Sequence, residues 1–493
     1  MNIPLIYRSL SYACLALALM FIVMFLSIAM LSVNYPFHLE WMEGQSIDTI
    51  ARVAKNRPIY TEPTLEYVPF IYTPLYFYVS GMLAKLVGVD FFVGRLVSIL
   101  SILATGVLLF AWVRKEGGDR LSAWVAAGIF FATYPLSGRW FDVARVDSLF
   151  VCLSVASMYV FIYRQNTVGA LLTAALLTAA FFTKQSALII AAPVLAAMFL
   201  INRHHALVTA ASLTIVMFTS ITIANLLSDD WFNFYVFEAP SGHWMDWRYF
   251  LGFWAEDMAH PLPLAMFLVL LCLIQLLVQQ KKGALLHLAF AAGLVGSAYV
   301  SRLHWGGYSN VLIPAHLCLA LYSGLALALY GKYFKATPHA ELLLIVPSMV
   351  LSQLLLLIYN PVPFVPTKES VRKGEVFLSQ LSLINGDIFM PEMQFVQTRV
   401  GKRSYSFGMA GFDILRADLG EKNYIREKLR DDLAEAITSQ RFAAVMPGRL
   451  IHLREAVGLY ELAYKLEYPQ EYVTGAINFV HTNLYVPIIS PKP

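Results

Sequence analysis

Long apolar runs separated by short polar turns fill the first 360 positions of the chain. Most runs approach the length of roughly 20 residues that an α-helix needs to cross a bilayer. Breaking the pattern at charged residues and at Pro- and Gly-rich loops predicts about eleven membrane-spanning helices. They are expected at residues 10–33, 93–113, 121–138, 147–163, 167–183, 186–202, 206–227, 262–280, 284–300, 309–331 and 341–359. The pattern is that of an all-α polytopic membrane protein.

The segment 72–88 is apolar enough to be a further span, but it is short and carries Lys85. The distribution of basic turns decides between the two topologies, because such turns stay in the cytoplasm. If 72–88 does not cross, all of the basic turns lie on the amino-terminal side. These turns hold Arg114 and Lys115, Arg164, Arg203, Lys281 and Lys282, and Lys332. We therefore expect 72–88 to be an interfacial or re-entrant helix.

This topology places six segments together on the opposite, extracytoplasmic side. They are the loop 34–92, the turn 139–146, the break 183–185, the loop 228–260, the turn 301–308 and the whole C-terminal segment. In the first of these loops, apolar residues recur at positions 47, 50, 51 and 54. That spacing predicts a short amphipathic helix lying along the membrane surface.

The composition changes near residue 360, where Pro361, Pro363 and Pro366 mark a linker. Beyond it, a charged helical stretch at 421–440 lies between short β-like runs. Such alternation favours a small α/β domain. The sequence thus predicts a transmembrane domain over 1–359, which includes the outer loop 34–92, and an extracytoplasmic α/β domain over 360–493.

The overall composition narrows the function classes. Of 493 residues, 58% are hydrophobic and 14% are charged, whereas a soluble protein carries about a quarter charged residues. The net charge is only +4 and there is no basic cluster, so we expect no nucleic-acid partner. The four cysteines and eleven histidines show no metal-ligand spacing. The sequence therefore indicates no cofactor and no metal site, and a divalent metal stays open without a motif for it.

Two acidic residues lie where apolar runs meet the outer surface. Glu43 lies in Glu40-Trp41-Met42-Glu43-Gly44, and Asp147 begins a later run. A carboxylate at a lipid–water boundary costs free energy and is a candidate functional residue. Glu43 can accept a proton from an acceptor hydroxyl, or it can be a helix-start acid favoured by the helix dipole, with Glu40 merely solvated. Asp147 has the same two interpretations, with Arg145 as its local ion-pair partner.

Several cations belong to the same side of the membrane. Arg95 begins the second span, Arg145 precedes Asp147, and Lys184 interrupts an apolar stretch. A buried lysine there is costly unless an anion pairs with it. Arginine binds phosphate oxygens bidentately and lysine binds them as a point charge. His304 can contribute to the same site, and snorkelling to the headgroups is the alternative role for these side chains.

Aromatic residues are dense in two of the outer loops. Four of the nine tryptophans, including Trp244, lie in 228–260, and tyrosines including Tyr72 and Tyr76 crowd 67–78. An aromatic belt at the interface explains most of this density. A lid that stacks on a sugar or gates a lipid is the alternative function.

Taken in order, these pieces resemble the C-type (GT-C) glycosyltransferase superfamily. The likeness is to the branch of protein O-mannosyltransferases, aminoarabinose lipid A transferases and RgtA/B/C/D-like bacterial transferases, and it covers roughly residues 10–230. It is carried by the segment from Glu43 to Arg52, by Tyr72-Thr73-Pro74-Leu75-Tyr76, by Gly94-Arg95, by Arg145-Val146-Asp147 and by Thr183-Lys184.

The resemblance implies inverting transfer of a sugar from a polyprenyl-phosphate donor to an extracytoplasmic acceptor. It implies Glu43 as the general base or as an acid that positions the acceptor, with Asp147 as its partner, and Lys184, Arg95 and Arg145 as ligands of the donor phosphate. Tyr72, Tyr76, Trp244 and His304 are the expected substrate contacts. A lysine that precedes the proline in the aminoarabinose branch is Thr73 here, which argues against an aminoarabinose donor.

Two other functions stay open. A transporter or flippase of lipid-linked sugar is one, although the inverted repeats common in transporters are absent from the sequence. A scaffold for envelope polysaccharide assembly, with the C-terminal segment as a docking module, is the other. We expect the partners to be a lipid-linked sugar, an unidentified acceptor and the bilayer. The expected location is a bacterial inner membrane, with the site and C-terminal domain on the periplasmic side.

Overall fold

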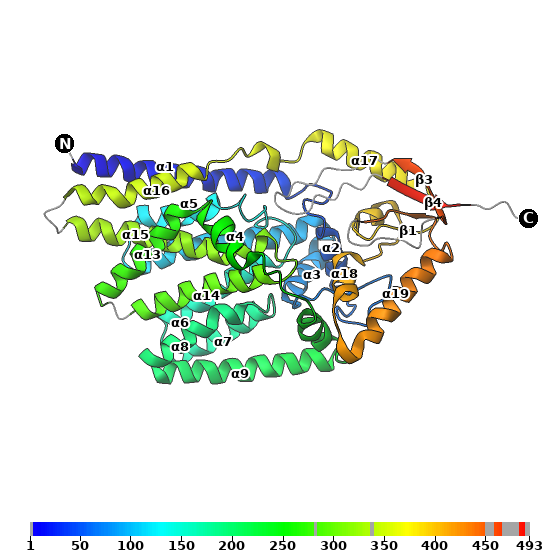
Figure 1. Ribbon diagram of the computed structural model, residues 1–493, viewed down its shortest axis with the longest axis horizontal. Coiled ribbons are helices and arrows are strands. Elements are labelled where there is room, and N and C mark those ends of the chain that lie inside the picture. The colour runs from blue at the N-terminus through cyan, green and yellow to red at the C-terminus, as the bar shows by residue number, and fades with distance from the viewer. Residues whose placement is uncertain (1–2, 281–282, 336–339, 449–457, 466–482, 489–493) are drawn as a thin grey trace, which may run out of the picture.

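Apolar helices make up most of this protein. The computed structural model describes residues 3–280, 283–335, 340–448, 458–465 and 483–488. The helices of the first 360 residues lie side by side in an elongated bundle, and the remaining elements gather at one of its ends (Figure 1). Each range predicted as a span contains one helix. These are α1 (Ile3–Ser32), α4 (Phe91–Lys115), α5 (Arg120–Ala132), α6 (Asp147–Tyr163), α7 (Thr167–Phe181), α8 (Ala187–Ile201), α9 (Arg203–Leu226), α13 (Pro263–Val278), α14 (Ala284–Leu303), α15 (Ile313–Lys335) and α16 (Ile345–Leu356).

Length and hydropathy qualify only some of these helices as spans on their own. Among the described residues, five are long and apolar enough, and a sixth qualifies if α13 and the bent helix Tyr249–Ala259 before it form one span. The two parts of that pair meet at 93°. The multi-pass character is therefore established, whereas the count of eleven spans stays a prediction.

Small residues let the helices of the bundle approach closely. A side chain added at Gly128 of α5 would meet Ala18 of α1 at 2.3 Å, and one at Gly293 of α14 would meet the Ile190 carbonyl oxygen of α8 at 2.4 Å. Membrane helices associate through such contacts because lipid tails offer no hydrophobic driving force between them. Helix α9 lies at the edge of the bundle, where Phe218 is 70% and Leu226 is 74% exposed, as lipid-facing residues are.

The two ends of the bundle differ as the loop charges predict. At one end, the ammonium of Lys332 donates to the Gly117 carbonyl and Arg114 donates to Gly118, so two of the predicted basic turns meet there. The Lys281–Lys282 turn lies outside the described residues. At the other end lie the short helices α2 (Glu43–Ala54) and α3 (Leu75–Val87). Helix α3 is about 20 Å long at 1.5 Å per residue, too short for a hydrocarbon core of about 30 Å, which agrees with an interfacial helix.

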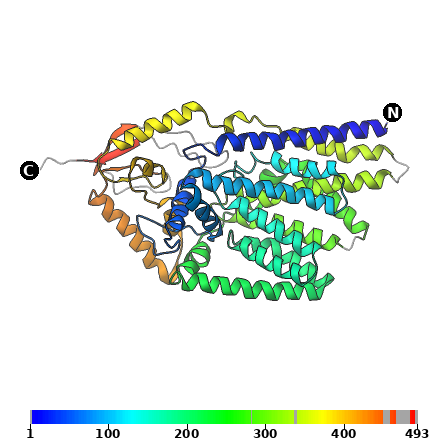
Figure 2. The ribbon, with the colours of Figure 1, turned by 180° about the vertical axis from the view of Figure 1, so that it is seen from behind.

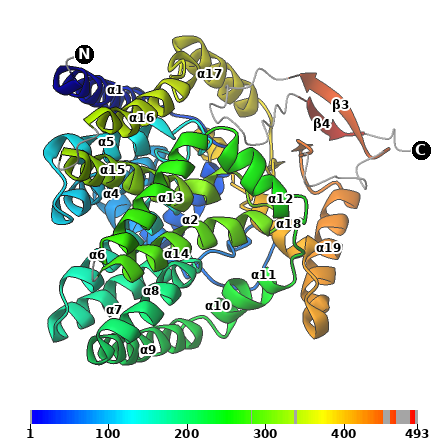
Figure 3. The same ribbon diagram turned by 60° about the vertical axis from the view of Figure 1, so that its left-hand side comes forward.

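The loop between α9 and α13 is folded into short helical turns over the same end. They are α10 (Trp231–Asn233), the π-helix η1 (Phe234–Glu238), α11 (Ala239–Ser241), α12 (Tyr249–Gly252) and the π-helix η2 (Phe253–Ala259). Figure 3 shows α11 beside α18 (Gly408–Arg416) of the C-terminal segment, and the Asp418 amide donates to the Gly242 carbonyl there.

The C-terminal segment combines helices with a small mixed sheet. Its main elements are α17 (Lys368–Ser382), β1 (Ile388–Phe389), α18 (Gly408–Arg416), α19 (Asn423–Thr438), β2 (Ala444–Val445), β3 (Tyr460–Lys465) and β4 (Asn483–Pro487). The strand order is β1-β2-β4-β3, with β1 and β2 parallel and the other pairs antiparallel. Helix α19 lies in the charged stretch expected to be helical, and β1 and β2 lie in the β-like runs on either side of it; that this segment is a separate domain stays a prediction.

This segment is bonded to the first outer loop rather than standing apart from it. Tyr67 and Ser406 form a parallel bridge. The Gln45 side chain of α2 donates to the carbonyls of Ser406 and Phe407, at 3.2 and 3.1 Å. Seen from behind, the first outer loop lies between the bundle and the C-terminal segment (Figure 2).

Candidate active site

Five of the six segments predicted to share one side line a cavity of about 280 Å³ at this end of the bundle. The sixth, the turn 139–146, reaches the wall through Arg145, which donates to Tyr72. The cavity wall combines polar side chains from four parts of the chain. They are Tyr72 of the first loop, Lys184 and Gln185 between α7 and α8, His304 and Asn310 around the α14–α15 turn, and Asp413 and Arg416 of α18. The predicted gathering of these segments is therefore observed.

Glu43 forms a closed ion pair behind this cavity. Its carboxylate accepts from Arg95 Nε at 3.0 Å and from Arg95 Nη2 at 2.7 Å, and both side chains are fully buried. The amides of Leu39 and Ala144 also donate to it, each at 2.7 Å. Burial alone would raise the pKa of Glu43, but Arg95 and these amides outweigh it and lower the pKa below its ordinary value. Both carboxylate oxygens are thus occupied.

The hydrogen-bond donors of Arg95 are engaged by Glu43 and by backbone carbonyls. Its remaining donors bind the carbonyls of Tyr35 and Phe37, at 2.5 and 2.6 Å. This guanidinium thereby joins the end of α1 to the first turn of α2, where the dipole favours an acid such as Glu43. Neither Glu43 nor Arg95 lines the cavity.

Glu40, which one of the two interpretations of this segment left solvated, is completely buried, so that part of the interpretation is wrong. One of its carboxylate oxygens lies 3.5 Å from Arg145, and the other has no hydrogen-bond partner among the described residues. Burial raises the pKa of Glu40 to about 7, against the opposing effect of Arg145. A carboxyl poised near neutral pH is suited to accept a proton.

Arg145 links Glu40 to the cavity wall. Its Nη2 donates to the Tyr72 hydroxyl at 2.9 Å, and Tyr72 lines the cavity. Burial raises the pKa of Tyr72 to about 12, so this phenol stays protonated at neutral pH. Glu40 therefore lies one side chain behind the cavity surface.

Asp147, the first residue of α6, is paired with Lys184, which lines the cavity. Lys184 Nζ lies 2.7 Å from Asp147 Oδ1, and Asn310 Nδ2 donates to the same oxygen at 3.0 Å. The second oxygen of Asp147 has no partner within the described part of the chain. The Lys184 side chain keeps 13% exposure, so its ammonium can hold Asp147 and still bind a ligand anion.

The C-terminal segment contributes residues that the sequence did not predict. Arg416 pairs with Asp413 at 2.6 Å and lies 4.2 Å from the centre of the Trp305 ring. His243 approaches Arg416 at 3.3 Å, and its ring lies 5.2 Å from that of His304. Burial and the neighbouring Arg416 lower the pKa of His243 to about 4, so at neutral pH Arg416 is the cation of this group.

Of the three remaining residues predicted to contact the substrate, one lines the cavity and two do not. His304 lines the cavity beside Tyr72 and Lys184. Tyr76 is buried in α3, where its hydroxyl donates to the Gly94 carbonyl at 2.8 Å, and it does not reach the cavity. Trp244 is 68% exposed beside Trp305 and lies outside the cavity lining. Within the described residues, no group of three His, Cys, Asp or Glu side chains is placed to hold a metal ion.

The residues that sequence reasoning missed gave little signal. Glu40 lies between the apolar Leu39 and Trp41, and that context was the only hint that it is buried. Asp413 and Arg416 form an ordinary i, i+3 pair on a short helix. Their role depends on the docking of α18 against the outer loops, which local sequence does not reveal.

Comparisons with known proteins agree with this arrangement. Residues 69–227 match a family model described as dolichyl-phosphate-mannose-protein mannosyltransferase. The crystal structure of ArnT from Cupriavidus metallidurans in the apo state superposes with a TM-score of 0.60 at 11% identity, over 96% of this chain and 99% of that chain. The same ArnT bound to undecaprenyl phosphate gives 0.59 at 10% identity, over 96% and 98%. No curated protein sequence matches.

The family model lies within the stretch 10–230 that carries the sequence resemblance, and the fold comparison extends over nearly the whole chain. Both point to the superfamily that the sequence suggested. Residues 69–227 are thus similar to that mannosyltransferase family, and nearly the whole chain has the fold of ArnT.

Proposed function

We propose that this protein transfers a sugar from a polyprenyl-phosphate donor to an extracytoplasmic acceptor, with inversion at the anomeric carbon. The observation that carries the proposal is the cavity lined by Lys184 and Arg416. The buried acids Asp147 and Glu40 lie next to it, where Asp147 pairs with Lys184 and Glu40 with Arg145. A structure of ArnT with this fold is bound to undecaprenyl phosphate, which supports a lipid phosphate as the donor group.

The leaving group of such a reaction is a phosphate monoester anion. It needs cations more than a general acid, because its negative charge grows as the glycosidic bond breaks. Lys184 and Arg416 supply that charge at the cavity wall, and Asp147 fixes the ammonium of Lys184. Arg145 supports the site from behind, through Tyr72. Arg95 belongs to the framework rather than to the phosphate site, since its donors are already bonded.

The acceptor hydroxyl must lose a proton as it attacks. We propose Glu40, rather than Glu43, as the base, because Glu40 has an oxygen without a partner in the described structure and a pKa near 7. Glu43 then positions Arg95 and the loop that carries Glu40. Small movements of Tyr72 and Arg145 on substrate binding would expose the Glu40 carboxylate, since catalytic hydrogen bonds often form fully only in the substrate complex.

The topology belongs to the same proposal. We place the cavity and the segment 360–493, as a separate α/β domain, on the periplasmic side of a bacterial inner membrane, with eleven spans in the domain 1–359. The meeting of basic turns at the far end of the bundle supports this orientation.

The test is transfer from a radiolabelled undecaprenyl-phosphate sugar in membranes that contain the full-length protein. We expect Glu40→Gln and Asp147→Asn each to lose about 100-fold or more in rate, as is typical for removing a general base or a charge that positions a phosphate ligand. The matched control is Glu238→Gln, a half-exposed acid on the same side, which should keep wild-type activity. Full activity in both variants, or movement of the lipid across reconstituted vesicles without loss of its sugar, would contradict the proposal.

A further inference from the structure

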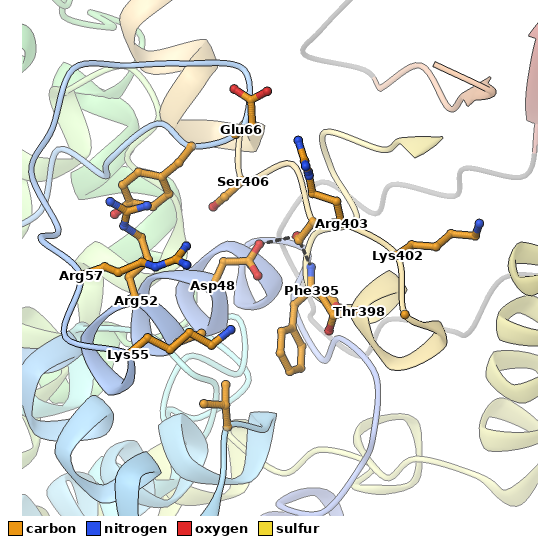
Figure 4. Close-up of a pocket in the computed structure, with 15 residues that line it drawn as sticks. Asp48, Arg52, Lys55, Arg57, Glu66, Phe395, Thr398, Lys402, Arg403 and Ser406 are labelled. Carbon is orange, nitrogen blue, oxygen red and sulfur yellow. Dashed lines mark hydrogen bonds between the residues drawn. The ribbon is translucent and has the colours of Figure 1, made fainter. Parts of the chain in front are cut away.

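A second and larger cavity lies against the other half of α2. It has a volume of about 650 Å³, within the range of small-molecule sites. One wall is the face of α2 that carries Asp48, Ala51, Arg52 and Lys55, which share it by helical spacing. The opposite wall is the stretch from Phe395 to Ser406 of the C-terminal segment. Figure 4 shows the side chains of the two walls facing one another across the cavity.

Cationic side chains outnumber acidic ones around it. Five cations line the cavity, namely Arg52, Lys55, Arg57, Lys402 and Arg403, against the two acids Asp48 and Glu66. Two of the cations are already engaged. Arg52 donates to the Pro58 carbonyl at 2.8 Å and covers the Tyr67 ring at 3.8 Å, and Lys402 donates to the Gly386 carbonyl at 3.2 Å.

The other three cations are uncommitted. Lys55, Arg57 and Arg403 are exposed, and none makes a side-chain hydrogen bond or ion pair with any residue that the structure describes. Glu66 cannot neutralise them, since it pairs with Arg441 at 2.5 Å. The acid Asp48 is turned to Ser404, whose hydroxyl donates to it at 2.6 Å. The cavity therefore presents unpaired positive charge to a ligand.

The wall opposite α2 is held in a strained shape. Phe395 has φ of 68°, a conformation that bulky residues rarely adopt. It is fixed by a relay in which its amide donates to Ser404 Oγ at 2.9 Å, while that hydroxyl donates to Asp48. Strained residues persist where the surroundings over-determine them, and they cluster at ligand sites. In this conformation Phe395 lines the cavity (Figure 4).

We infer that this cavity binds an acidic saccharide, through a carboxylate or phosphate on the sugar. The cations suit the anion, the Ser406 hydroxyl, which has no partner in the described structure, suits a sugar hydroxyl, and the Phe395 ring offers an apolar face. An anionic phospholipid fits less well, because Ala51 and Val89 are the only aliphatic residues of the lining.

The length of helix α2 separates this cavity from the proposed reaction centre. Helix α2 has 12 residues and is about 18 Å long at 1.5 Å per residue, with Glu43 at one end and Lys55 just past the other. A saccharide of a few units bound here could reach from this cavity toward the Glu40 carboxylate. If the proposed function holds, on which this assignment rests, the ligand is the acidic part of the acceptor.

Direct binding to the purified full-length protein tests the inference without any donor. The probes are a hyaluronan tetrasaccharide, which carries two carboxylates, glucose 6-phosphate for the phosphate class, and the carboxyl-reduced, neutral form of the tetrasaccharide. Mixed micelles of phosphatidylglycerol form the lipid arm. We expect an acidic saccharide to bind and the neutral one not to bind, with affinity that falls as salt rises.

The variant Arg57→Glu/Arg403→Glu should bind the acidic saccharide at least tenfold more weakly. Both side chains are exposed and unbonded in the described structure, so folding is not at risk. The matched control is Arg430→Glu on α19, an exposed arginine outside the cavity lining, which should bind like the wild type. Equal binding of acidic and neutral probes, equal binding by the double variant, or binding of phosphatidylglycerol alone would each overturn the inference.

The two proposals fail separately in this design. The Glu40→Gln variant should lose transfer but bind the acidic saccharide like the wild type. Absence of sugar transfer by the wild-type protein would contradict the proposed function and would leave the binding result unaffected.

Discussion

At the residue scale, two buried glutamates three positions apart have opposite environments. Glu43 receives four close donors from Arg95, Leu39 and Ala144, whereas Glu40 has one distant cation in Arg145. A buried charge is stable only when it is paired and hydrogen-bonded. Glu43 is therefore part of the framework that holds the loop, and Glu40 is the group whose ionisation the fold disfavours.

This contrast predicts stability changes of opposite sign at pH 8. Glu43→Gln leaves Arg95 buried without its anion and should lower the free energy of unfolding by about 3–5 kcal/mol. Glu40→Gln should raise it by up to about 3 kcal/mol, since a rise in pKa from 4.5 to about 7 corresponds to roughly 1.4 kcal/mol per unit. Thermal unfolding of the purified proteins in detergent measures both changes, and shifts of the same sign would contradict the assignment.

The gain from Glu40→Gln should also depend on pH in a defined way. Because the folded-state pKa of Glu40 exceeds its unfolded value, the folded protein binds more protons between about pH 4.5 and 7, and its stability falls as pH rises through that window. The gain should therefore vanish near pH 4 and be complete above pH 7. In the wild type, kcat/KM should rise with pH to a plateau above about 7, as the base becomes ionised. A rate independent of pH between 5.5 and 8 would exclude Glu40 as the base.

At the element scale, helix α18 completes a cavity that the membrane helices begin. It brings Asp413 and Arg416 against His243, His304 and Trp305, which come from two other outer segments. The amphipathic character of such a helix is visible in sequence, but its partner surface is not. This is why Lys184, a lysine within an apolar stretch, was predictable as a site residue, whereas Arg416 was not.

We expect Arg416→Ala to weaken use of the lipid-linked donor about tenfold in kcat/KM, mainly through a higher KM, because one cation of two is lost from the phosphate site. Arg416→Lys should restore part of the activity, since a point charge remains. Steady-state transfer assays with varied donor measure the effect. Arg430→Ala on the neighbouring helix α19 is the control, and an Arg416→Ala enzyme with unchanged donor KM would remove this residue from the donor site.

At the scale of the whole molecule, the sequence predicted the helices and their grouping better than the contacts between them. Apolar runs and basic turns were sufficient to place all of the outer segments at one end, but the pairing of Asp147 with Lys184 was not predicted. Tyr76 and Arg95 do not line the cavity, because their side chains make long-range hydrogen bonds to Gly94 and to the end of α1. A local pattern cannot show whether a polar side chain faces a cavity or another backbone.

The orientation of the whole protein can be tested by labelling. Three of the four native cysteines are buried and Cys152 is only partly accessible, so background reaction should be low. We expect Arg403→Cys, at the cavity end, to react with a membrane-impermeant maleimide on intact cells. Gln165→Cys, in the predicted cytoplasmic turn between α6 and α7, should react only after permeabilisation. The reverse pattern would invert the topology and the proposed side of the reaction.

The amide of Gln45 has a consequence for how this architecture can be engineered. Its bonds to the carbonyls of Ser406 and Phe407 make the amino-terminal loop and the far end of the polypeptide a single mechanical unit, although some 360 positions separate them in sequence. A chimera that exchanges only the C-terminal segment with that of another protein of this fold would leave the Gln45 side chain facing a foreign backbone. Changing the acceptor preference by segment exchange would therefore require replacing the first outer loop and the C-terminal segment together.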